Sequence, residues 1–212
     1  MKGLFSQDSK FMLAMGLVCD LVILNVIYII TCIPVFTIGA ATTALYTVCA
    51  SMGTVREGRL LKGYFSAFAS SFKQATVLWL GILVLGGASF VNLLFFRAAA
   101  GPLRWLCLVF GVALLIILLV SAYVFPLLSR FENSSISTVK NALLLSIGYF
   151  PRSAAVVIIN VFPFALLLLD IVLFMQTGFI WVIIYFSAGA FIGSRILKKV
   201  FAPYLGDEEE EK

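Results

Sequence analysis

Four polar side chains lie inside long apolar runs of the sequence, where a charged or strongly polar group is costly. They are Asp20, Asn25, Asn160 and Asp170. Ionisable residues within membrane-length segments by default indicate a solute path or a buried polar pair. Asp20 and Asp170, however, lie near the ends of their runs, where a hydrated carboxylate costs little. A solute path and a structural role are therefore both open for these four residues.

Catalytic chemistry finds little support in this chain. It contains no histidine, which removes the commonest general base and metal ligand. No G-x-S-x-G, H-E-x-x-H, P-loop or G-x-G-x-x-G pattern occurs. The four cysteines, at positions 19, 32, 49 and 107, lack C-x-x-C spacing. We therefore expect no enzymatic activity, no metal site and no cofactor.

The composition predicts the fold class. The 212 residues are 62% apolar and 12% charged, with a mean hydropathy of +1.11, whereas globular domains are about half apolar and a quarter charged. We expect an all-α, polytopic transmembrane helical bundle that forms one domain over residues 1–205. Residues 206–212, which end in DEEEEK, predict an acidic disordered tail. The net charge of +5 comes from basic loops, so no nucleic-acid partner is expected.

Long apolar runs predict about six spans, at residues 16–36, 40–55, 75–96, 105–128, 153–174 and 179–197. The second is short for a crossing. A re-entrant segment around residues 34–46, with five crossings elsewhere, is therefore the alternative.

Two polar stretches between the spans predict amphipathic cytoplasmic helices, at residues 56–73 and 129–152. Their apolar positions recur at helical spacing and are Leu61, Tyr64, Phe65, Phe68 and Phe72 in the first, and Ile136, Val139, Leu143, Ile147 and Phe150 in the second. Such helices either anchor in the membrane surface or dock in a groove on a partner protein. The docking hypothesis uses Phe65, Phe68 and Phe72, with Arg56, Glu57, Arg130 and Glu132 as rim charges.

Charge distribution predicts the topology. With six crossings and both termini in the cytoplasm, only Arg97 and Arg104 of the 15 lysines and arginines face outward. This predicts a multi-pass protein of the cell membrane. It also places the turn between the first two spans on the outer side.

That turn is the most specific stretch of the chain. It runs from Pro34 to Tyr46 with the sequence PVFTIGAATTALY. Pro34 disfavours helix continuation, the Thr37 hydroxyl can cap a new helix, and Gly39 allows another backbone to approach closely. The hydroxyls of Thr37, Thr42 and Thr43 can satisfy carbonyls freed by the break. A structural hairpin and a binding site are both open for this signature turn, which comprises Pro34, Thr37, Gly39, Thr42, Thr43 and Tyr46.

The turn closely resembles the signature of the YesL-like family of bacterial integral membrane proteins, a domain of unknown function. The resemblance continues through F-x-x-F-x-x-x-F-K at residues 65–73, Y-x-x-P-L at 123–127, RFEN at 130–133 and KNA at 140–142. It implies a protein typical of Gram-positive bacteria, often encoded beside sugar importers of the ABC type.

Together these observations favour a non-enzymatic membrane protein that acts as an accessory or membrane subunit of an ABC-type carbohydrate importer. The expected partners are the lipid bilayer and the importer's permease and ATPase subunits. An autonomous small-solute transporter or channel is the alternative. The G-x-x-x-G pattern of Gly189 and Gly193 serves either internal packing or a homo-oligomer.

Overall fold

The computed structural model describes residues 10–52, 60–99, 101–131 and 133–201, and the regular structure in these ranges is helical. The all-α fold class is thereby confirmed, while the acidic tail lies outside the described residues. In chain order the elements are α1 (Lys10–Cys32), the 3₁₀ turn η1 (Val35–Thr37), α2 (Ile38–Ser51), α3 (Leu60–Ala98), the 3₁₀ turn η2 (Gly101–Trp105), α4 (Leu106–Leu128), α5 (Ser135–Gly148), α6 (Phe150–Leu169), α7 (Ile171–Gln176), α8 (Gly178–Ile180), the π-helical turn η3 (Trp181–Tyr185) and α9 (Phe186–Phe201).

Five helical segments among the described residues are long and apolar enough to cross a membrane. They cover residues 14–32, 60–98, 101–128, 150–169 and 178–201. The predicted span at residues 40–55 is instead α2, a helix of 14 residues. Its length of about 21 Å is short of a bilayer's hydrocarbon core, and nine of its residues are buried. Five described helices are thus of spanning length, one fewer than the six predicted spans and the number named in the five-span alternative.

Helix α3 is a single continuous helix of 39 residues. The prediction of a separate amphipathic helix at residues 56–73 followed by a span at 75–96 is wrong at their junction. Lys73, Gln74 and Ala75 are all good helix formers, and no proline interrupts the segment. The helix is about 58 Å long, which exceeds the 40–45 Å of a whole bilayer.

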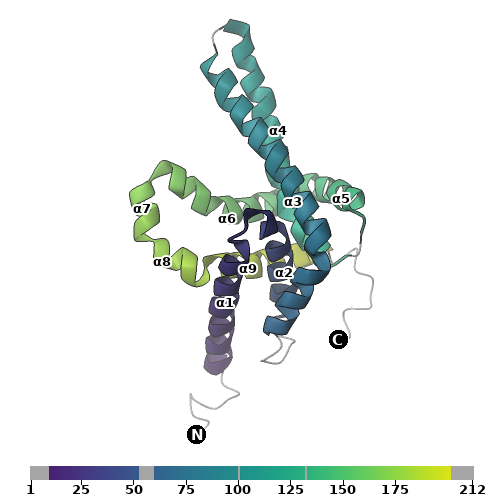
Figure 1. Cartoon of the computed structure of the whole chain (residues 1–212), viewed down its shortest axis with the longest axis vertical. Coiled ribbons are helices and arrows are strands. Elements are labelled where there is room, and N and C mark those ends of the chain that lie inside the picture. The colour runs from purple at the N-terminus through teal and green to yellow at the C-terminus, as the bar shows by residue number, and fades with distance from the viewer. Residues whose placement is uncertain (1–9, 53–59, 100, 132, 202–212) are drawn as a thin grey trace.

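Helices α3 and α4 form an antiparallel hairpin whose outer half extends beyond every other described element (Figure 1). Near its end the rings of Phe96 and Phe110 stack with centroids 5.5 Å apart. Gly101, which begins η2, has a φ of +73°, a conformation that glycine adopts without strain.

The last third of the chain departs from the predicted spans at residues 153–174 and 179–197. The span expected at residues 153–174 ends at Leu169, where the Asp170 side chain accepts hydrogen bonds from the backbone of Val172 and Leu173 and so caps α7. The segment 178–201 contains the π-helical turn η3. Helices α6 and α9 run across the direction of α3 (Figure 1).

The core lies where α2, the first half of α3, the end of α4 and α9 meet. Tyr64, Tyr123 and Phe201 are its largest fully buried side chains. Large apolar side chains elsewhere are widely exposed, as expected of a protein surrounded by lipid.

Candidate functional site

The signature turn is closed by hydrogen bonds to its own backbone. The Thr37 hydroxyl donates to the carbonyl oxygens of Thr31 and Pro34, at 2.5 and 2.6 Å. The prediction that this hydroxyl caps the following helix is wrong, because Thr37 makes no side-chain cap bond to α2. The hydroxyl donates instead to carbonyl oxygens at the end of α1 and in the turn, which have no backbone partner within an α-helix.

The turn packs tightly against the middle of α3. A Cβ atom on Gly39 would lie 2.5 Å from the carbonyl oxygen of Ala75 and 2.7 Å from the Cβ of Trp79. The indole nitrogen of Trp79 donates to the carbonyl oxygen of Val35 over 2.8 Å. This role of Trp79 could not be predicted, since a tryptophan in an apolar run carries no local signal for its partner.

Hydroxyl groups join the turn to its neighbours. The Tyr64 hydroxyl lies 2.7 Å from that of Thr31 and donates to the carbonyl of Ala41 at 3.4 Å. Thr42 and Thr43 donate to carbonyls one turn earlier within α2. These contacts join the turn to α1 and α3 and fix the first turns of α2.

The last signature residue, Tyr46, packs on α9. A Cβ atom on Gly193 would lie 2.9 Å from the Tyr46 hydroxyl oxygen, and one on Gly189 would lie 3.0 Å from the side chain of Ile159. The G-x-x-x-G pattern therefore receives α2 and α6 of the same chain. The Tyr46 hydroxyl is buried without a hydrogen-bond partner among the described residues; the Asn160 amide lies close to it but outside bonding geometry.

Helix α5 presents an apolar stripe to the outside. The predicted residues Ile136, Val139, Leu143, Ile147 and Phe150 are all exposed, with Ile136 at 83% and Ile147 at 65%. The opposite face is held in the bundle through Thr138, Ala142 and Ser146, which are buried. Ser134 begins the helix by accepting a hydrogen bond from the backbone of Ser137. We call these five exposed residues, of which Phe150 is the first residue of α6, the α5 stripe.

The docking residues expected at 56–73 are arranged differently. Phe65 is exposed, but Phe68 and Phe72 are half-buried, and Phe68 stacks on the fully buried Tyr64 with ring centroids 6.4 Å apart. Arg130 is half-buried. Arg56, Glu57 and Glu132 lie outside the described residues.

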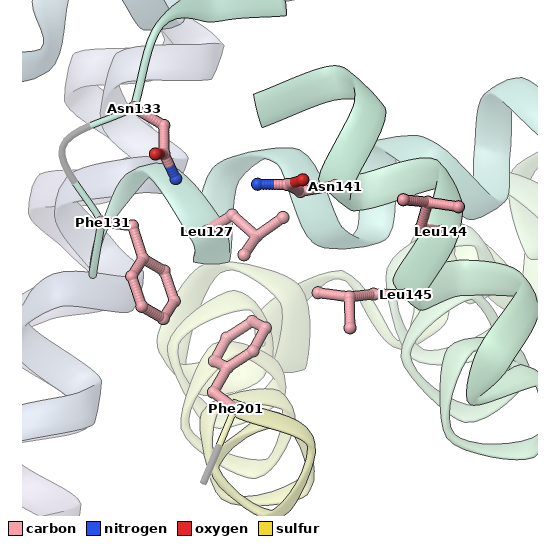
Figure 2. Close-up of a pocket in the computed structure, with 7 residues that line it drawn as sticks. All are labelled: Leu127, Phe131, Asn133, Asn141, Leu144, Leu145 and Phe201. Atoms are coloured by element: carbon pink, nitrogen blue, oxygen red, sulfur yellow. The ribbon is translucent and has the colours of Figure 1, made fainter. Parts of the chain in front are cut away.

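A cavity of about 180 Å³ opens beside α5, between the ends of α4 and α9. Its lining is apolar except for two amides and comprises Leu127, Phe131, Asn133, Asn141, Leu144, Leu145 and Phe201. In Figure 2 the side chains of Asn133 and Asn141 point toward one another over Leu127. The side chain of Gln74 donates to the carbonyl oxygen of Asn133 over 2.7 Å, which ties the cavity to α3. Sequence reasoning did not identify this cavity.

The four residues of the hypothetical solute path are not brought together. Asn25 is fully buried and bonded to the carbonyls of Trp181 and Val182, and it accepts from the backbone of Ser187. Asp170 caps α7, Asn160 is exposed on α6, and Asp20 is half-exposed on α1. None of them lines the cavity beside α5.

Comparison with known proteins gives one match. Residues 21–93 match the model of a family described as a protein of unknown function, DUF624. The match begins in α1, includes the whole signature turn and α2, and ends in α3. No curated protein and no solved structure matched the chain.

Proposed function

Since residues 21–93 belong to the DUF624 family, which is that of the YesL-like proteins, we propose that this membrane protein is a non-enzymatic accessory or membrane subunit of an ABC-type carbohydrate importer. Its α5 stripe would dock on the importer's permease or ATPase subunits. The family resemblance supports the class of partner. The burial of one face of α5 and the exposure of the other support the docking surface.

The observation that carries the proposal is the division of α5 into two faces. One face is buried in the bundle through small and hydroxylated residues, while Ile136 and Ile147 are exposed on the other, next to the exposed Phe150 at the start of α6. A helix with a fixed orientation and apolar positions at i, i+3 and i+7 suits insertion into a groove on a protein. The exposed Lys140 lies beside the stripe and can contribute a charge to its rim.

The segment at 60–73 takes a smaller part in this proposal than the sequence indicated. Phe68 and Phe72 are half-buried with ring centroids 5.5 Å apart, and Phe68 packs against the core, so their replacement would disturb the fold as well as any docking. Phe65 is the aromatic residue of that segment with an exposed ring. Variants of α5 therefore give the cleaner test.

The test compares two double variants in affinity purification from native membranes in mild detergent. Ile136→Ser with Ile147→Ser removes the two most exposed side chains of the α5 stripe. Leu168→Ser with Leu169→Ser removes equally exposed apolar side chains from the end of α6, at 77% and 85% exposure. We expect the parent protein and the α6 variant to retain the permease and ATPase subunits. The α5 variant should lose them by about tenfold, the effect of about 1.4 kcal/mol of binding free energy.

The remaining outcomes each decide the question. If the importer subunits do not co-purify with the parent protein, the proposal fails. If the α5 variant leaves the membrane fraction, the stripe anchors the protein in the membrane surface. Solute flux through the purified chain in vesicles, without other proteins, would instead support the autonomous transporter.

A further inference from the structure

Helix α3 divides into a polar and an apolar half, and its partner α4 matches the apolar half. No charged residue occurs between Lys73 and Arg97 on α3, or between Arg104 and Arg130 across α4. Residues 74–96 form about 35 Å of helix, close to the thickness of one hydrocarbon core. The two uncharged stretches therefore lie side by side in the hairpin, with Arg97 and Arg104 at its tip and Lys73 and Arg130 at its other end.

The outer half of this hairpin is surrounded by apolar side chains that no other described element covers. On α3 these include Leu83, Val84 and Val91, and on α4 Leu108 and Val112. Helix α1 runs from the signature turn in the opposite direction (Figure 1), so one flat bilayer holds either the hairpin or α1 in this arrangement. The first turns of α3 lie beside the end of α1, where the Tyr64 hydroxyl is 2.7 Å from that of Thr31. These turns carry the exposed Lys62, Ser66 and Ser70, whereas residues 74–96 carry no charge, which favours the hairpin as the membrane-crossing unit.

The signature turn is attached at one end of that unit. Gly39 and Val35 contact α3 at Ala75 and Trp79, directly after Lys73. At the same level, Gln74 bonds to Asn133 in the segment that leads into α5. The tip of the hairpin, with Arg97 and Arg104, lies about 30 Å farther along α3.

We infer that the signature turn and the tip of the α3–α4 hairpin lie on opposite sides of the membrane, so that the turn shares a side with α5. This differs from the arrangement expected from charge alone, which placed the turn and the tip together on the outer side. The basic residues still indicate which side of the membrane is cytoplasmic. Lys73 on α3, Lys140 on α5 and Arg152 on α6 belong to the end of the hairpin where α5 lies, and positive charge marks the cytoplasmic side. The family signature thus becomes part of the cytoplasmic face.

Single cysteines test this inference. The four native cysteines are first replaced by alanine, and one cysteine is then introduced at an exposed site: Val35→Cys in the turn, Leu103→Cys at the tip, or Lys140→Cys on α5. Cells stripped of their wall are treated with a membrane-impermeant maleimide, before and after permeabilisation. We expect the cysteine at 103 to react in intact cells, and those at 35 and 140 to react only after permeabilisation.

Labelling at 35 and 103 from the same side would overturn the inference. So would a cysteine at 35 that reacts only after denaturation, because the turn would then lie within the hydrocarbon. Retention of each variant in the membrane fraction serves as the folding control. The result is independent of any importer subunit, so this inference and the proposed function can fail separately.

Discussion

At the scale of single residues, Gly39 is the glycine of the described chain on which an added Cβ would meet its neighbours most closely. An alanine there would bring its Cβ to 2.5 Å from the Ala75 carbonyl oxygen, so α2 and α3 would have to separate. We expect Gly39→Ala to lower the free energy of unfolding by about 1–3 kcal/mol. Gly87→Ala is the matched control, because a Cβ on Gly87 meets no atom within 4 Å. Thermal unfolding in mild detergent measures both; equal midpoints would contradict the close packing.

Asn25 has a structural role that its residue type alone did not reveal. Its side chain joins α1 to the π-helical turn, where it bonds to two carbonyls and one backbone amide of the chain near residue 185. Asn25→Leu should destabilise the protein by about 1–3 kcal/mol for each buried group left unpaired. Asn92→Leu is the control, since Asn92 bonds to the carbonyl of Ala88 within its own helix. If Asn25 instead served a solute path, Asn25→Leu would abolish solute flux in vesicles and leave the free energy of unfolding unchanged.

At the scale of elements, the continuity of α3 is the feature that most changes the predicted arrangement. Spin labels on Phe65→Cys and Val84→Cys, both exposed positions, would be separated by 19 residues of helix. In the background free of native cysteines, a continuous helix predicts about 29 Å between their Cα positions. A helix lying in the membrane plane and bent near residue 74 would give about 20 Å. Pulsed electron paramagnetic resonance distinguishes these distances. The shorter distance would support the predicted separate amphipathic helix and contradict a continuous α3.

Elements with strong local signals could be predicted, and their long-range partners could not. The expected span at 105–128 agrees with α4 at 106–128, because an uncharged apolar run sets its length. The apolar positions of α5 were found from their spacing. The contacts of Trp79 with Val35 and of Gln74 with Asn133 depend on how distant helices meet, which no local pattern records. The break at Asp170 was missed because a cap inside an apolar run resembles an intramembrane acid.

At the scale of the whole molecule, the G-x-x-x-G face of α9 is the surface on which α2, from the first half of the chain, and α6, from the second half, both pack. Gly193 receives Tyr46 from α2, and Gly189 receives Ile159 from α6. Because these two glycines are covered by α2 and α6, a second copy of the chain could contact them only if α9 separated from both helices. The homo-oligomer through these glycines and the internal contact therefore make different predictions for the same substitution.

Gly193→Ala should lower the unfolding midpoint and leave the oligomeric mass unchanged, because its Cβ would lie 2.9 Å from the Tyr46 hydroxyl oxygen. Combination with Tyr46→Phe should recover much of the loss, since that change removes the oxygen in conflict, a buried hydroxyl without a partner among the described residues. A coupling free energy of about 0.5–3 kcal/mol in this double-mutant cycle would demonstrate the contact. A change of mass in native mass spectrometry, with no change in unfolding, would instead place the glycines between two copies of the chain.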